Sequence, residues 1–215
     1  MKNILLILPF LIITSANLNA QDSHRFDEEI KSITELTMPV GKDLAVFTGS
    51  SSIRLWKDLE KDCHGMQVIN TGFGGSSMSD LLYFIDQAVL RFRPNKVYIY
   101  EGDNDIAANI EPQEILRAAM LIVNKILESN SGTKIYFISA KPSPSRWKYK
   151  DQYVAFNSLL KDYCDSHQQL FYIDVWNKML DENDRPAPHI FTSDSLHMNR
   201  QGYLLWEDII CKDFK

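Results

Sequence analysis

The sequence has no excess of basic residues and only three cysteines, and both shortages exclude classes of function. Its 23 Lys and Arg residues are outnumbered by 28 Asp and Glu residues, for a formal net charge of −5. Binding to nucleic acid needs a basic face, so we expect no nucleic-acid partner. The cysteines form neither a CxxC pair nor a cluster with histidine, so we also expect no structural zinc site.

The cysteines themselves are an odd set, Cys63, Cys164 and Cys211. At least one of them is therefore unpaired within a monomer. We expect buried free thiols, because cysteine outside metal sites behaves as a small apolar residue. A disulfide between Cys164 and Cys211 is the alternative.

The N-terminus carries an apolar run that is too short to span a bilayer. The run covers residues 4–13 and follows Lys2, whereas a transmembrane helix needs roughly 20 apolar residues. A polar stretch ending in the small residue Ala20 comes next, and no cysteine follows to carry a lipid. This layout is typical of a secretory signal peptide. We therefore expect a signal peptide over 1–20, one mature domain over 21–215, no stable membrane anchor, and a secreted or periplasmic protein.

The rest of the chain alternates short apolar runs with longer amphipathic ones. The runs predict five strands, at 44–48, 68–70, 96–100, 134–139 and 170–175. The spacing of apolar residues predicts helices over 78–90, 112–129 and 149–167, and a last helix capped by Asn199. Repeated strand–helix alternation predicts an α/β fold: a flavodoxin-like, three-layer α/β/α sandwich with a five-stranded parallel sheet. No internal repeat or linker marks a second domain.

Polar loops follow the first two predicted strands, at the sheet edge where ligands bind in such folds. Segment 48–52 (Thr-Gly-Ser-Ser-Ser) offers hydroxyl groups, although a polar turn that caps a helix explains it as well. Segment 70–76 (Asn-Thr-Gly-Phe-Gly-Gly-Ser) has three glycines that let the backbone approach a ligand closely. It lacks the GxxxxGK pattern of a phosphate-binding loop and the spacing of a dinucleotide-binding loop.

Two further segments carry groups suited to acid–base chemistry. Segment 101–105 (Glu-Gly-Asp-Asn-Asp) follows the third strand and indicates either a metal site or an Asn that stabilises an oxyanion. Asp194 stands three residues before His197, so that its carboxylate can accept the imidazole Nδ1–H and leave Nε2 free to take a proton. A surface turn with a solvated histidine is the alternative for the last segment.

These four segments, in this order, resemble the four blocks of the SGNH hydrolase superfamily, also called GDSL lipases and esterases. The resemblance runs from about residue 45 to 206, and segment 47–56 looks like the subgroup with GSS in place of GDS. It implies a catalytic triad, made of the nucleophile Ser51 with His197 and Asp194.

The resemblance also implies an oxyanion hole, formed by the Ser51 and Gly75 N–H groups and the Asn104 side chain. The sequence departs from most relatives at Ser50, where they carry Asp. This departure leaves Ser50 and Ser52 as competing hydroxyls for the role of nucleophile.

The implied function is that of a serine esterase or acylhydrolase that cleaves a carboxylic ester through an acyl-enzyme intermediate, without metal or cofactor. Small acyl groups on carbohydrate are the first expectation for the substrate, and a lysophospholipid or thioester is the second. Arg146 and Trp147, after the fourth strand, are candidate contacts for a sugar or a polar headgroup, with simple packing as the alternative for Trp147.

Two other functions fit parts of the pattern. A non-catalytic, flavodoxin-like module could bind an anionic ligand at helix N-termini. A metal-dependent phosphatase could use the carboxylates of Asp103, Asp105 and Asp194.

Overall fold

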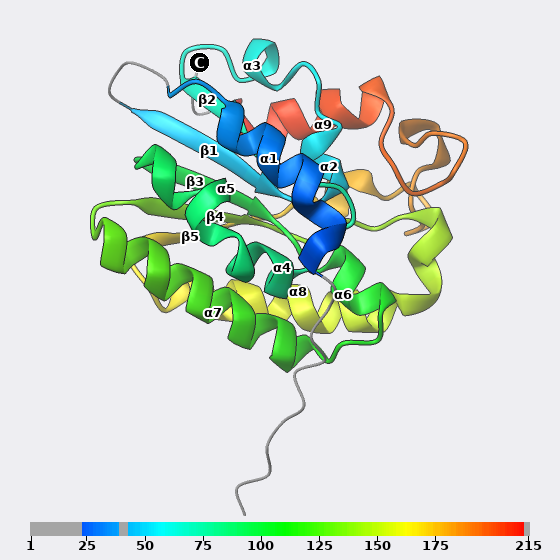
Figure 1. The fold of residues 1–215 in the computed structure, drawn as a ribbon. Coiled ribbons are helices and arrows are strands. Elements are labelled where there is room, and N and C mark those ends of the chain that lie inside the picture. Colours follow the sequence, from blue (N-terminus) through cyan, green and yellow to red (C-terminus); the bar gives the residue numbers. More distant parts are fainter. Residues whose placement is uncertain (1–22, 39–42, 213–215) are drawn as a thin grey trace, which may run out of the picture.

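The computed structural model describes residues 23–38 and 43–212, so the predicted signal peptide lies outside the described residues. Five strands form one sheet in the order β2-β1-β3-β4-β5, and every neighbouring pair is parallel (Figure 1). The strands are β1 (Leu44–Gly49), β2 (Gln67–Asn70), β3 (Lys96–Tyr100), β4 (Lys134–Ile138) and β5 (Leu170–Ile173). The prediction of an α/β fold with a five-stranded parallel sheet is confirmed.

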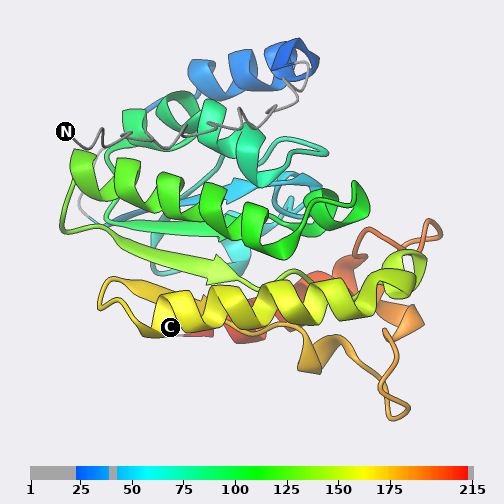
Figure 2. The ribbon, with the colours of Figure 1, turned by 90° about the horizontal axis from the view of Figure 1, so that it is seen from below.

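Helices cover both faces of the sheet, as the parallel arrangement requires. One face packs against α1 (Asp27–Glu35), α4 (Met78–Tyr83), α5 (Ile85–Ala88), α7 (Pro112–Ser129) and α8 (Lys150–Asp165). Figure 2 shows α7 in green and α8 in yellow lying side by side. The other face packs against α2 (Ser51–Arg54), α3 (Leu59–Asp62) and α9 (Arg200–Ile210).

Short elements complete the chain, and several of them lie next to the site described below. The helix α6 (Asp103–Ala107) follows β3 directly. Short 3₁₀ helices are found at Ser23–Phe26, Leu90–Phe92, Pro144–Tyr149, Asn177–Met179 and Pro188–Ile190. No helix in the described parts of the chain is long and apolar enough to cross a bilayer.

The helix predicted over 78–90 is broken into three pieces, whereas the helix predicted over 112–129 is found with the same bounds. The first break lies at Phe84, whose φ of −96° and ψ of 16° depart from helical values. Apolar residues on both sides of the break are buried, including Leu81, Ile85 and Ala88. The apolar periodicity continues through the break, which is why the pattern did not reveal it.

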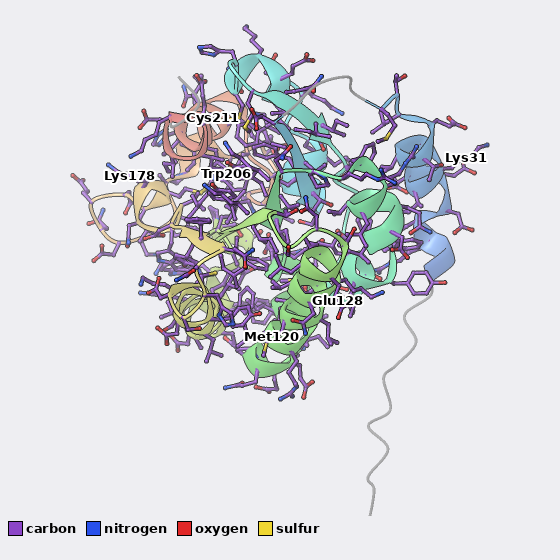
Figure 3. The ribbon with its side chains drawn as sticks, turned by 90° about the vertical axis from the view of Figure 1, so that its left-hand side faces the viewer. Lys31, Met120, Glu128, Lys178, Trp206 and Cys211 are labelled. Carbon is purple, nitrogen blue, oxygen red and sulfur yellow. A yellow bond between two sulfur atoms is a disulfide. The ribbon has the colours of Figure 1, made fainter. Side chains whose placement is uncertain are left out.

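The expectation of buried free thiols is confirmed for Cys164 and wrong for the other two cysteines. Cys63 and Cys211 form a disulfide, with their Cα atoms 5.0 Å apart, and Cys164 is the buried free thiol. Cys63 ends α3 and Cys211 ends α9, on the same face of the sheet, whereas Cys164 lies on α8 at the opposite face. Figure 3 labels Cys211 and Trp206 close together on the α9 side of the molecule, and both are fully buried. The pairing depends on which face each helix covers, and the sequence pattern did not provide that information.

The sheet order places the chain reversal between β1 and β3. The chain leaves β1 toward β2 on one side and returns to β3 on the other, which makes a topological switch point. The loops after β1, β2 and β3 therefore meet at the carboxyl edge of the sheet. The arrowheads in Figure 1 point to this edge, beside α2 and α6.

Candidate active site

Ser51 and His197 meet at the carboxyl edge although 146 positions separate them in the chain. Ser51 is the first residue of α2, directly after β1, and its Oγ lies 3.0 Å from His197 Nε2. Its neighbours Ser50 and Ser52 are 1% and 3% exposed, whereas Ser51 is half-buried. Of the three serines, Ser51 therefore has its hydroxyl both beside the imidazole and open to solvent.

Asp194 holds the other nitrogen of the same imidazole. Its Oδ2 lies 2.6 Å from His197 Nδ1, and its Oδ1 accepts hydrogen bonds from the backbone N–H groups of Leu196 and His197 and from the Thr192 hydroxyl. Burial acts to raise the pKa of the Asp194 carboxyl, but these hydrogen bonds outweigh it and hold the pKa well below its usual range. An ionised Asp194 keeps the proton on Nδ1, so Nε2 is free to accept the Ser51 proton.

The loop that carries Asp194 and His197 is fixed by its backbone. Ser195 has a positive φ of 59°, which turns the chain so that Asp194 faces His197. The Ser145 N–H donates to Ser195 O over 3.1 Å, so the turn after β4 contacts this loop. Asn199 caps α9, as predicted, by accepting from the N–H groups of Gln201 and Gly202.

Two glycines shape the backbone near Ser51, one at the end of β1 and one in the loop after β2. At Gly49 the φ is 121°, and a Cβ there would lie 2.0 Å from Tyr100 O, so only glycine fits between β1 and β3. Gly75 has a φ of 80° but open space around it, so its backbone conformation, not crowding, favours glycine. The N–H of Phe73 donates to Gly49 O over 2.9 Å and holds the Gly75 loop against the Ser51 loop.

Asn104 reaches the same loop from α6. Its Nδ2 donates to Ser76 O over 2.8 Å, which places the amide beside Gly75. Its Oδ1 accepts from Arg146 Nη2 over 2.9 Å. The structure thus brings Gly75 and Asn104 together, and it directs Arg146 toward Asn104 and Asp103.

Asp103 is a buried carboxylate with an unusual number of partners. It accepts from Lys141 Nζ at 3.2 Å, Arg146 Nη1 at 2.6 Å, and the hydroxyls of Tyr100 and Tyr153. Burial acts to raise the pKa of the Asp103 carboxyl, but Lys141 and Arg146 outweigh it and hold the pKa well below its usual range. We name Asp103, Lys141 and Arg146 the Asp103 cluster.

Glu101 lies two residues earlier and shows the opposite behaviour. Burial is the main reason that its pKa is raised well above the ordinary value, and nearby Asp105 adds to the shift. Its Oε1 lies 2.6 Å from Ser76 Oγ, and its Oε2 is buried without a hydrogen-bond partner among the described residues. Burial likewise raises the pKa of Asp105 to about 7, although the Met78 N–H bonded to its carboxylate opposes the shift.

Trp147 packs against another indole. Its ring is stacked on Trp176 with centroids 5.9 Å apart, and the cations of Lys150 and Arg185 lie over its ring. The ring is half-buried and belongs to the same turn as Ser145, which contacts the His197 loop.

The three carboxylates of the phosphatase alternative do not converge. Asp103 is bound by Lys141 and Arg146, Asp105 accepts from the Met78 N–H, and Asp194 is bound to His197. Within residues 23–38 and 43–212, no group of three or more His, Cys, Asp or Glu side chains is placed to hold a metal.

Sequence reasoning placed Ser76 and Glu101 in polar segments but gave them no role, and it gave none to Lys141 or Tyr153, although all four lie around Asn104 or Asp103. The positions of Asp103 and Arg146 were noted, but for a metal and for the substrate respectively. A lysine in the loop after a buried strand, and acidic residues beside an Asn, were the available signals. They did not show which charges pair.

Comparison with known proteins agrees with the geometry. The profile of the GDSL-like Lipase/Acylhydrolase family matches residues 32–205. No curated protein matches the chain.

Similar solved structures share the fold at low identity. A proposed acylhydrolase from Bacteroides fragilis is 21% identical with a TM-score of 0.75, and covers 90% of this chain and 97% of its own. A GDSL-like lipase from Bacteroides thetaiotaomicron is 20% identical with a TM-score of 0.71, with coverages of 90% and 97%. An acetylxylan esterase from Geobacillus stearothermophilus is 12% identical with a TM-score of 0.68, with coverages of 83% and 96%. With its family profile matched over most of its length and the SGNH hydrolase fold around a Ser–His–Asp arrangement, the chain belongs to the GDSL-like lipase/acylhydrolase family.

Proposed function

We propose that this protein is a serine esterase that transfers an acyl group from a carboxylic ester to Ser51 and then to water. The observation that carries the proposal is the contact chain from Ser51 Oγ to His197 Nε2 at 3.0 Å and from His197 Nδ1 to Asp194 at 2.6 Å. A hydroxyl, an imidazole and a carboxylate in this sequence activate a nucleophile without metal or cofactor.

The reaction begins when Ser51 Oγ attacks the carbonyl carbon of the ester while His197 Nε2 takes the hydroxyl proton. Negative charge develops on the carbonyl oxygen, where the N–H groups of Ser51 and Gly75 and the Asn104 amide donate hydrogen bonds. The C–O bond to the alcohol breaks, and His197 protonates the departing alkoxide. Water then attacks the acyl-enzyme by the same route, releasing the acid and restoring the Ser51 hydroxyl.

Small acyl groups on carbohydrate are the substrate class that we favour. An acetylxylan esterase is among the proteins with this fold. Trp147 is half-buried and belongs to the turn that contacts the His197 loop, and the exposed part of an indole beside a site suits a sugar. A panel of acetylated xylo-oligosaccharides, lysophospholipids and acyl thioesters tests this choice: we expect the highest kcat/KM on the acetylated sugars, and a higher value on either other class would replace it.

Replacement of the nucleophile tests the reaction itself. Ser51→Ala should nearly abolish hydrolysis of p-nitrophenyl acetate and labelling by a fluorophosphonate probe, because no other hydroxyl contacts His197 Nε2 in the described residues. Ser52→Ala, which removes a buried neighbouring hydroxyl, should retain both activities. A wild-type protein that neither hydrolyses esters nor reacts with the probe would support the non-catalytic binding module, and loss of activity in EDTA would support a metal enzyme.

The protein is proposed to act after export. The N-terminal pattern of a signal peptide supports this location, and so does the Cys63–Cys211 disulfide, because disulfides persist in oxidising compartments. Mass spectrometry of the exported protein should give a mature chain that begins at Gln21. A chain that retains residues 1–20 would contradict cleavage.

A further inference from the structure

Arg146 contacts both Asn104 and Asp103, and its side chain is mostly buried. We infer that Arg146 is a positioning residue, whose guanidinium holds the Asn104 amide so that one N–H faces the oxyanion. The inference rests on the proposed esterase function and differs from the sequence-based expectation that Arg146 binds the substrate.

The two ends of the Asn104 amide are assigned by their partners. Arg146 Nη2 lies 2.9 Å from one end, and a guanidinium only donates, so that end is the oxygen. The Ser76 carbonyl lies 2.8 Å from the other end, and a carbonyl only accepts, so that end is the NH₂ group. One of its two protons points to Ser76, and the second remains available for an oxyanion.

The guanidinium is itself committed to protein atoms. Its Nη1 donates to both the carbonyl oxygen and the carboxylate of Asp103, at 2.9 and 2.6 Å, while Nη2 donates to Asn104. The Arg146 side chain is only 17% exposed, and that of Asp103 is 6% exposed. A planar fork that joins two adjacent residues in this way fixes their relative orientation, which a lysine cannot do.

Lys141 completes the arrangement by sharing the Asp103 carboxylate. Its side chain is 1% exposed and its Nζ lies 3.2 Å from Asp103 Oδ2. Two cations thus share one anion, so Arg146 retains positive character next to the Asn104 oxygen. A cation at the amide oxygen polarises the amide and strengthens its N–H as a donor. Arg146 therefore acts on the reaction through the orientation and the donor strength of Asn104.

A double-mutant cycle on the full-length mature protein tests this inference. Loss of an oxyanion donor costs about 10²–10³ in rate, and an effect transmitted through Asn104 cannot exceed that. We expect Arg146→Met to lower kcat for p-nitrophenyl acetate by about 10–100-fold with KM within about twofold. In an Asn104→Ala background, the same change should cost less than about threefold, because the residue that Arg146 positions is gone. Lys148→Met removes an exposed cation from the same turn and should leave kcat unchanged in both backgrounds.

Each outcome distinguishes positioning of Asn104 from binding of the substrate by Arg146. An equal loss in both backgrounds, or a raised KM as the main effect, would overturn the inference and return Arg146 to substrate binding. If Arg146→Met fails to fold, Arg146→Lys keeps the charge and loses the fork; it should lower kcat only when Asn104 is present, and an unchanged kcat would overturn the inference. An inactive wild-type protein would overturn the proposed function as well, whereas an active wild type with an additive cycle would overturn the role of Arg146 alone.

Discussion

The two sides of the Ser51 site are built in different ways. On the proton-transfer side, Asp194 and His197 lie three residues apart on one loop, with side chains 48% and 29% exposed. On the proposed oxyanion side, Asn104 is held by Arg146, which pairs with Asp103. Asp103 also pairs with Lys141, and the side chains of these two residues are 6% and 1% exposed. The first side is exposed to solvent and formed by one local turn. The second side is held by buried charges that lie far apart in the chain. Substitutions on the first side should therefore change rate alone, whereas those on the second should change stability too.

Asp194→Asn should cause a large loss of activity and leave the fold intact. The amide cannot stabilise the imidazolium and favours the wrong tautomer of His197, so we expect kcat to fall by about 10³–10⁴-fold. The Asn oxygen can still accept the loop N–H bonds made by Asp194 Oδ1, and the side chain is half exposed, so the melting temperature should hardly change. Steady-state kinetics and a thermal melt on the same sample check both parts. Unchanged kinetics would exclude Asp194 from the proton-transfer side.

Asp103→Asn, on the oxyanion side, should lower the stability of the fold. Removing this carboxylate leaves Lys141 and Arg146 buried without their anion, and such a loss typically costs about 3–5 kcal/mol. Urea unfolding of the variant should show a decrease of that size in the free energy of unfolding.

The stability that the Asp103 carboxylate provides depends on pH, and the direction of the Asp103 pKa shift gives the sign of that dependence. The Asp103 pKa is lowered in the folded protein, so its contribution to stability is present above the unfolded pKa near 3.8 and is lost as pH falls below it.

The matched control for Asp103→Asn is Asp151→Asn, at an exposed carboxylate on α8. Its free energy of unfolding should stay within about 0.5 kcal/mol of the wild type. Equal stability of the two variants would show that the Asp103 cluster does not support the fold.

The two sides also differ in how far the sequence predicts them. The spacing of Asp194 and His197 predicted that these two side chains meet, and the polar loops after successive strands predicted one shared edge, because parallel strands end together. The choice of Ser51, Gly75 and Asn104 came from the resemblance to the SGNH hydrolases. The contacts of Arg146 were not predictable in the same way, because a guanidinium near a site suits a substrate as well as a buried carboxylate. The partner of Cys63 was missed for a related reason: pairing depends on which sheet face α3 and α9 share. Periodicity gives an element and its buried stripe, but not its neighbour across the core.

Glu101 and Asp103 show the limits of reading charge from sequence, since both are buried on one short segment. Asp103 faces two cations and is ionised. Glu101 faces Ser76, whose Oγ also lies 3.0 Å from Phe73 O. A hydroxyl has one proton, and a carbonyl can only accept it, so a protonated Glu101 that donates to Ser76 satisfies both contacts. The raised pKa of Glu101 agrees with this neutral form.

Glu101→Gln should therefore alter mainly the pH dependence of stability, and its effect should be smallest at acidic pH. An amide can donate to Ser76 as the protonated carboxyl does, so the two proteins should be about equally stable below the ordinary pKa of 4.5, and the variant should be the more stable of the two at pH 7. In the wild type, unfolding releases the Glu101 proton above the ordinary pKa of 4.5, so stability falls as pH rises toward the higher folded pKa. The slope from one such group is at most about 1.4 kcal/mol per pH unit, and glutamine lacks it.

Free energies of unfolding measured between pH 5 and 8 show whether Glu101 is protonated or ionised in the folded protein. The wild-type curve should fall more steeply than that of Glu101→Gln. Asp105, whose pKa is raised to about 7, gives both proteins the same additional downward slope between about pH 4 and 7. The difference between the curves therefore isolates Glu101. Glu128→Gln, at an exposed position on α7 that Figure 3 labels, should run parallel to the wild type. If Glu101→Gln runs parallel as well, Glu101 is ionised in the folded protein, and the contrast with Asp103 is lost.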